Sequence, residues 1–442
     1  MRSFRLRAEI GAWAVFAALA LFHLYWVAHT AVDLPYWDDW EMLEAWALPG
    51  GLSWKWLFSI HSESVLVPTR LETWILYRLT AWNIAAHQIL NFLVFLLGPL
   101  LAAAAARASS AGLPGPLAPA FLIFWLSPLA FENHSWATNG CIHFQISFLL
   151  AAAYFWFRHE SSWPLFAAGL GMTWLSLNSF SSGIPASLAL VLGFCAFKMK
   201  SAMESKSAGR ARTLRLQAAL AAMFVGCALL WWKSGYRKIE GSPSLTWPDT
   251  AEFWRFFLNL IAQGFGMDQL SAALGMLCLI LALAPLKKLL SNRQAMPQAW
   301  AAATLIGAAL AIMAAIALGR ASQGLGEAKT SRYAEFGMLL PFLTAWAWQL
   351  RLAKDGRRVI VIACLWAFCF LGFLNNWRFD VYRTVEAKRL EGRRCIEKNL
   401  GSAPLICRGV YPFDLSAKLD RARALELSFT RPWAVLNPRA GI

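Results

Sequence analysis

The chain has 442 residues, of which 58% are hydrophobic and 15% are charged, and its formal net charge is +16. Soluble domains carry about a quarter charged residues, so this composition excludes an ordinary soluble globular protein. Apolar runs recur from end to end and predict an all-α polytopic membrane protein. The positive charge does not indicate nucleic acid as a partner, because no nucleic-acid-binding module is present and basic loops orient membrane helices.

Eleven apolar segments are long enough, or nearly so, to cross a bilayer. The first is expected to stay uncleaved, because it exceeds a signal-peptide core and no small-residue cleavage site precedes Asp33. The predicted spans are Ile10–Thr30, Ala85–Ala106, Leu117–Phe131, Ile142–Phe157, Pro164–Phe180, Ile184–Met199, Leu216–Trp232, Leu270–Leu286, Ala299–Leu318, Tyr333–Leu350 and Val359–Asn375.

The distribution of Lys and Arg predicts which loops face the cytoplasm. Basic residues gather in the loops on the same side as the amino terminus, most densely in 198–215, whereas 132–140 and 181–183 hold none. The positive-inside rule therefore predicts an amino terminus inside and a carboxy terminus outside. A transmembrane domain, 1–376, then exposes outer loops at 31–84, 132–141, 233–268 and 319–332, and 377–442 forms a small outer tail.

The outer segments contain stretches suited to the membrane surface. Residues 41–46 have helical spacing, and Val67–Leu79 is amphipathic, so both are predicted to be interfacial helices. Trp254, Phe256 and Phe257 give the segment 233–266 a similar interfacial character. In the tail, Cys395 and Cys407 would lie in an oxidising compartment and are predicted to form a disulfide.

One short polar stretch stands out directly after the first span. Asp38, Asp39 and Glu41 lie within four residues and are flanked by aromatic side chains of the membrane interface. Mutual repulsion and desolvation raise the pKa of such carboxyl groups. Carboxylates of this kind serve proton transfer, metal binding or a cationic partner. The alternative is a solvated loop start held by aromatic anchors.

Further ionisable residues fall on the same predicted side, at the ends of spans where burial near lipid is costly. Arginine matches phosphate oxygens, so Arg70, Arg320 and Arg332 are candidate phosphate ligands. The other candidates for substrate binding are His61, Glu63, Glu132, His134 and Tyr333. The alternatives are that His61 and Glu63 form a solvated turn, that Glu132 and His134 end a helix, and that the arginines reach to lipid phosphates.

Together these motifs resemble the GT-C class of integral-membrane glycosyltransferases. The resemblance rests on the aromatic-flanked Asp38-Asp39 after an uncleaved span and on His61-x-Glu63 about twenty residues later. The stretch Gly319-Arg320…Ser331-Arg332-Tyr333 is similar to one in uncharacterised bacterial members of that group.

The resemblance implies an inverting enzyme on the periplasmic face of the bacterial inner membrane. Its donor would be a polyprenyl-phosphate-linked sugar, and its acceptor a lipid-linked or cell-envelope glycan. It implies that Asp38 or Asp39 acts as the base on the acceptor, in some members with a divalent metal such as Mg or Mn. The sugar and the acceptor are not specified by these motifs.

Three other functions fit parts of the pattern. A transporter or flippase of a lipid-linked or anionic substrate would place charges near the bilayer midplane on broken helices, and the Gly183–Pro185 stretch is one such break. A polysaccharide polymerase or ligase would share the lipid donor and the arginines without needing the early Asp-Asp pair. A structural membrane protein would need no convergence of polar groups.

Overall fold

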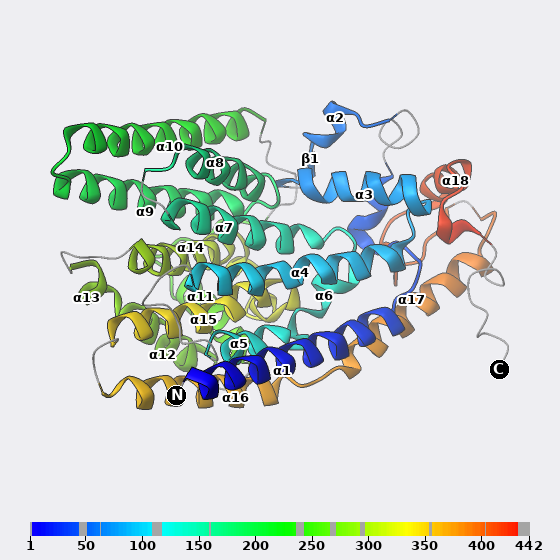
Figure 1. The fold of residues 1–442 in the computed structure, drawn as a ribbon. Helices are drawn as coiled ribbons and strands as arrows, with labels where there is room; N and C mark the ends of the chain where they lie inside the picture. The colour runs from blue at the N-terminus through cyan, green and yellow to red at the C-terminus, as the bar shows by residue number, and fades with distance from the viewer. Residues whose placement is uncertain are drawn as a thin grey trace.

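A computed structural model describes residues 2–43, 51–61, 63–107, 117–158, 161–235, 243–265, 271–291, 297–352, 356–402 and 404–431. These residues form an almost entirely helical molecule in which long helices lie side by side (Figure 1). The only sheet among them is a two-stranded hairpin of β1 (Ile60–His61) and β2 (Ser64–Val65). The chain is an all-α polytopic membrane protein, as its composition predicts.

In the described part of the chain, eight helical segments are long and apolar enough to cross a membrane. A helix satisfies its own backbone hydrogen bonds, which is why apolar sequence takes this form in lipid. The helices are α1 (Arg2–His29), α4 (Ile84–Arg107), α7 (Gly140–Arg158), α9 (Gly183–Glu204), α10 (Ala208–Gly235), α12 (Ser271–Leu283) with α13 (Leu286–Ser291), α14 (Pro297–Arg320) and α16 (Arg358–Asn375).

The other three predicted spans lie in the same bundle but differ from a full-length apolar helix. The continuous span expected at 117–131 is wrong: α5 (Leu117–Leu122) is followed by the 3-10 turns η2 (Ile123–Leu126) and η3 (Pro128–Ala130). Pro128 forces Ser127 into an extended backbone with ψ 140°, which ends the helix. The remaining two, α8 (Trp163–Leu177) and α15 (Ala334–Arg351), are continuous, but α8 has only 15 residues and α15 is less apolar, since it contains Glu335, Gln349 and Arg351.

The two ends of the bundle differ. The amino terminus, the α9–α10 turn and α13 lie at one end, and α2 (Trp54–Leu57), α3 (Val67–Thr80), α17 (Asp380–Lys398) and α18 (Ser416–Ala424) lie at the other (Figure 1). We call the second the cap end, because residues 380–431 form a small C-terminal cap there that ends with the 3-10 turn η9 (Ser428–Thr430).

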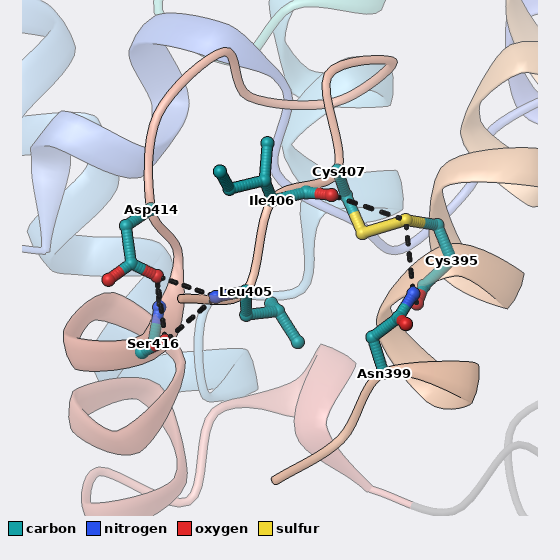
Figure 2. The surroundings of a disulfide bond; sticks show 7 residues. All are labelled: Cys395, Asn399, Leu405, Ile406, Cys407, Asp414 and Ser416. Atoms are coloured by element: carbon teal, nitrogen blue, oxygen red, sulfur yellow. Dashed lines mark hydrogen bonds between the residues drawn. A yellow bond between two sulfur atoms is a disulfide. The ribbon is translucent and has the colours of Figure 1, made fainter. Parts of the chain in front are cut away.

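A disulfide closes part of the C-terminal cap. The structure pairs Cys395, near the end of α17, with Cys407 (Figure 2). The segment that follows Cys407 folds back, so that Leu405 N donates to Asp414 Oδ1 at 2.9 Å. The disulfide therefore attaches an otherwise irregular segment to a helix that continues the bundle.

The remaining cap-end elements are short. They are η1 (Trp37–Met42), α6 (Phe131–Ser135), α11 (Ala251–Ala262) and the 3-10 turns η4 (Gln263–Phe265), η6 (Ala321–Gln323), η7 (Glu327–Lys329) and η8 (Ser331–Tyr333). The predicted outer loop 319–332 thus becomes three tight turns between α14 and α15. Residues 44–46 of the helix expected at 41–46 lie outside the described residues.

Two of the three stretches predicted to be interfacial, Val67–Leu79 and 233–266, pack differently in the structure. Helix α3 exposes Leu71, Ile75 and Leu79 and buries its opposite face, the arrangement expected of a helix in the interface. Helix α11 instead buries Phe256 and Phe257 in the same core cluster as residues of α12, α14 and α15. Its apolar face therefore contacts protein, and Trp254 is the one of the three aromatic residues that stays exposed.

Glycines allow some helices to pack closely. A Cβ at Gly275 of α12 would overlap the Leu258 carbonyl of α11, and a Cβ at Gly193 of α9 would overlap the Thr304 side chain of α14. Small residues at such crossings let backbones approach where no hydrophobic force distinguishes protein from lipid. These contacts hold α12 against α11 and α9 against α14.

Candidate functional site

A polar cavity of about 110 Å³ opens at the cap end and brings together residues far apart in sequence. We call it the Asp38 cavity. Six of the candidate side chains line it: Asp38, His61, Glu63, Arg320, Arg332 and Tyr333. They come from η1, the β hairpin, the end of α14 and η8, so no single stretch of sequence forms the site.

Asp39 lies outside this cavity, although it is the neighbour of Asp38. It is fully buried, and Oδ1 accepts hydrogen bonds from Thr138 N and Thr138 Oγ1, both at 2.9 Å. Its Oδ2 accepts from Tyr36 N at 3.0 Å and Ala137 N at 3.4 Å. Four donors occupy the carboxylate, so Asp39 joins η1 to the 137–138 turn and is not placed to take a proton from a substrate.

The hydrogen bonds of Asp39 also bear on whether the Asp38–Asp39 pair could bind a metal ion. Asp38 and Asp39 would be the ligands of any divalent metal of the kind found in some members of the class, but they do not present two open carboxylates to one point. Among the described residues, no group of three or more His, Cys, Asp or Glu side chains is arranged to hold a metal ion. The donor set therefore does not fit a divalent cation at this pair.

The charge on Asp38 is set by opposing neighbours. Burial raises the pKa of Asp38, the field of His61 lowers it, and the nearby Asp39 raises it again, with a net shift above the ordinary value. Arg332 also lowers this pKa, and Glu41 raises it. Because a raised pKa means a stronger base, Asp38 is suited to accept a proton.

The β hairpin positions His61 and Glu63. His61 pairs with Ser64 across the hairpin, and Ser64 Oγ accepts from Ser181 N at 3.0 Å, which ties the hairpin to the segment before α9. Glu63 Oε2 lies 3.5 Å from Arg320 Nη2, and both side chains are about one-third exposed. Arg320 therefore faces the cavity with a carboxylate beside it that an anionic ligand would displace or share.

Glu132 and Asn133 of α6 hold the turn that carries Arg332. Arg332 N donates to Glu132 Oε2 at 3.1 Å, and Glu132 N donates to Ser331 Oγ at 3.3 Å. Asn133 Nδ2 donates to Arg332 O at 3.0 Å. Glu132, a candidate substrate ligand, thus binds the backbone of the turn and does not line the Asp38 cavity.

A buried polar cluster inside the bundle supports the turn that carries Arg332. The ring of His134 stacks on that of His143 with centroids 5.1 Å apart, and His143 Nδ1 lies 2.8 Å from Glu335 Oε1. Asn133 Nδ2 donates to the same Glu335 oxygen at 2.6 Å. His134, predicted to bind substrate, is fully buried inside this cluster and supports the turn. The signal for Glu335 was an acidic residue in an apolar span, which sequence reasoning did not use.

Arg70 is also placed away from the cavity. It is 4% exposed, and its Nη1 donates to the carbonyl of Trp56 at 2.5 Å and to that of Ser59. Its guanidinium lies over the Trp56 ring, 5.6 Å from the centroid. Arg70 therefore closes the carboxy-terminal end of α2, where the carbonyls lack helical partners, and its place does not support the predicted phosphate role.

A larger and mostly apolar groove of about 550 Å³ adjoins the Asp38 cavity. The two share Glu63, Phe180, Ser181, Arg320 and Tyr333 in their walls. From there the groove continues past side chains of α9, α10 and α14 that are largely apolar: Ile184, Pro185, Trp232, Ala315, Ile316 and Leu318. A polar chamber with two arginines thus leads into an apolar channel among membrane helices.

The C-terminal cap holds η1 from the other side. Trp37 N donates to Val410 O at 2.8 Å, and Lys418 Nζ lies 3.0 Å from Glu41 Oε2. Tyr411 also donates to Glu41. Sequence reasoning missed these contacts, because they join residues more than 350 positions apart.

Comparison with known proteins identifies no relative of this chain. No family model, no curated protein and no solved structure matches it. The basis for a function is therefore the chemistry of the cavity and groove.

Proposed function

We propose that this chain transfers a sugar from a polyprenyl-phosphate donor to a hydroxyl of a lipid-linked or cell-envelope glycan acceptor. The observation that carries the proposal is the junction of the Asp38 cavity with the apolar groove. A polyprenyl-phosphate sugar has the same two parts, an anionic head and a long hydrocarbon tail. The tail would occupy the groove, and the head would lie beside Arg320 and Arg332, whose guanidinium groups suit phosphate oxygens.

The reaction follows from the groups that line the cavity. Asp38 accepts the proton of the acceptor hydroxyl while the oxygen of that hydroxyl bonds to the anomeric carbon of the sugar. The bond from that carbon to the phosphate oxygen breaks, and the phosphate leaves with the electron pair. Arg320 and Arg332 stabilise the charge that develops on the phosphate. A single displacement of this kind inverts the anomeric centre.

The same proposal includes eleven crossings, with the amino terminus inside and the site on the periplasmic face of a bacterial inner membrane. At the end opposite the cap, Lys200 Nζ donates to Leu290 O at 3.1 Å and Arg351 Nη1 to Ala284 O at 2.9 Å. Arg107 pairs there with Glu9 of α1. Basic residues from separate loops thus gather with the amino terminus, which supports this orientation.

The test is sugar transfer by purified protein in nanodiscs supplied with a labelled polyprenyl-phosphate donor pool. We expect Asp38→Asn to lower transfer by about 10²- to 10⁴-fold, the usual contribution of a general base. Asp420→Asn, on the exposed face of α18, is the matched control and should leave transfer unchanged. Full transfer by the Asp38 variant would contradict the assignment.

A flippase is the second candidate, because the same groove and cavity would accept a lipid-linked substrate that is moved and not cleaved. Pro185 at the start of α9 lines the groove and is the feature that favours it. Movement of labelled lipid across liposomes without donor cleavage would establish the flippase and exclude the transferase.

A further inference from the structure

A second polar cavity of about 550 Å³ lies on the other side of the Ser331–Arg332 turn. Glu132 and Ser331 line it, whereas Arg332 lines the Asp38 cavity, so the turn forms a wall between the two. We call it the Arg378 cavity. None of the groups in the proposed transfer reaction, Asp38, Arg320 and Arg332, belongs to its lining.

The charge in the Arg378 cavity suits a phosphate ester. Lys329 of η7 and Arg378 before α17 supply two positive side chains, and Glu132 is the carboxylate in its lining. One oxygen of Glu132 is already bonded to Arg332 N at 3.1 Å. The lining therefore offers a ligand an arginine whose guanidinium matches phosphate oxygens, together with a lysine.

Gln263 adds an acceptor. It lines the cavity and is 8% exposed, and its Nε2 donates to Thr330 O at 2.6 Å. Its Oε1 is buried and has no hydrogen-bond partner in the described part of the chain. A buried acceptor without a partner is costly, so a ligand that fills this cavity gains by donating a hydrogen bond to Gln263.

Two of the cavity's walls continue into surfaces suited to lipid. Ser271 begins α12 and Asn375 ends α16, and both line the cavity. Along α12, Met276 and Leu277 are each 44% exposed, and along α16, Leu371 and Leu374 are 58% and 53% exposed. Exposed apolar side chains on spanning helices face acyl chains, so a lipid lying against α12 and α16 would have its head group at this cavity.

We propose that the Arg378 cavity binds the phosphodiester head group of a membrane phospholipid that also carries an O–H or N–H donor. The phosphate lies between Lys329 and Arg378, and the donor faces Gln263 Oε1. Glycerol and ethanolamine head groups meet both conditions, whereas choline has no O–H or N–H to donate. This site does not depend on the proposed transfer reaction.

The test is native mass spectrometry of the full-length protein, titrated with phosphatidylglycerol, phosphatidylethanolamine or phosphatidylcholine. We expect the first two to bind at least about fivefold more tightly than phosphatidylcholine, the size expected of one hydrogen bond from a buried acceptor. Arg378→Gln should weaken all three lipids. Gln263→Leu should remove only the preference over phosphatidylcholine, and its thermal unfolding checks that the fold persists.

Arg394→Gln is the matched control, because Arg394 is an exposed arginine of α17 outside the cavity lining. Equal binding of the three lipids, or an Arg378 variant that binds like the control, would overturn the proposal. Free glycerol 3-phosphate provides the last arm. Weak binding of this soluble ester supports a lipid ligand, and binding as tight as that of phosphatidylglycerol would overturn the lipid as its source.

Discussion

The two walls of the Asp38 cavity are supported in different ways. The wall that carries Asp38 is a 3-10 turn held by the C-terminal cap and, through Asp39, by the 137–138 turn. The wall that carries Arg332 is a turn held by Glu132 and by a buried polar cluster of the bundle. The first depends on contacts outside the spanning helices, and the second on polar groups among them. The position of the proposed base therefore depends on the C-terminal cap, whereas the turn that carries Arg332, the proposed phosphate ligand, is held mainly by the bundle.

Backbone strain marks the Asp38 wall. Trp37, directly before Asp38, has φ +47°, a conformation that costs a non-glycine residue about 1–3 kcal/mol. Its N–H is held by Val410 O at 2.8 Å, and Val410 N in turn bonds to Cys407 O at 2.9 Å. Cys407 of the disulfide is thus three residues before Val410, whose carbonyl holds the strained position.

The largest expected effect lies in the Arg332 wall. Glu335→Ala leaves His143 and Asn133 without their buried carboxylate, and removing one member of a buried pair costs about 3–5 kcal/mol of unfolding free energy. Thermal unfolding in detergent measures it. Glu335→Gln keeps an acceptor for Asn133 and should lose less. Equal stability of the alanine variant and the wild type would show that this cluster does not support the turn.

The next effect lies in the Asp38 wall. Cys395→Ser with Cys407→Ser opens the loop between these residues, and a native disulfide contributes typically about 2–4 kcal/mol. We expect faster limited proteolysis of residues 399–415 and weaker sugar transfer, with the unfolding of the spanning helices unchanged. Cys364→Ser, an exposed free cysteine of α16, is the control. Unfolding of the spanning helices in the double variant would contradict the view that the two walls of the cavity are supported separately.

A smaller effect is expected from Lys418→Met, which removes the ion pair with Glu41. Burial would raise the pKa of Glu41, but hydrogen bonds from Tyr411 and Lys418 outweigh it and hold that pKa below its usual value. Both side chains are partly exposed, so the loss is about 1 kcal/mol or less. Proteolysis of the cap as a function of pH measures it, because protonation of Glu41 at low pH abolishes the difference between variant and wild type.

The smallest effect is a shift in pH dependence. His61 lowers the pKa of Asp38, so His61→Gln should raise that pKa and move the acidic limb of the activity profile to higher pH. The sign follows because the base must be deprotonated to act. Measuring the initial rate of sugar transfer as a function of pH gives the position of this acidic limb. A shift to lower pH would show that another group is the base.

Much of the site could be predicted, because spanning a membrane requires apolar runs and leaves the polar residues at their ends. Polar residues at the ends of apolar runs must gather at the same end of the bundle, and this placed Asp38, His61, Glu63, Arg320 and Arg332 together. The same pattern gave no means to separate Arg70, which serves the carbonyls of α2, from the two arginines of the cavity. All three are polar residues near span ends.

The sequence by itself determined the helices, the end of the bundle where the polar residues lie, and the cysteines available for a disulfide. These depend on the hydropathy and spacing of neighbouring residues. Only the tertiary structure decided between Asp38 and Asp39, because three of the four donors that occupy Asp39 come from Ala137 and Thr138, 98 and 99 positions away. It also decided that the turn at 331–332 separates two cavities. Hydrogen-bond saturation and burial depend on contacts between distant segments, and periodicity along the chain does not encode them.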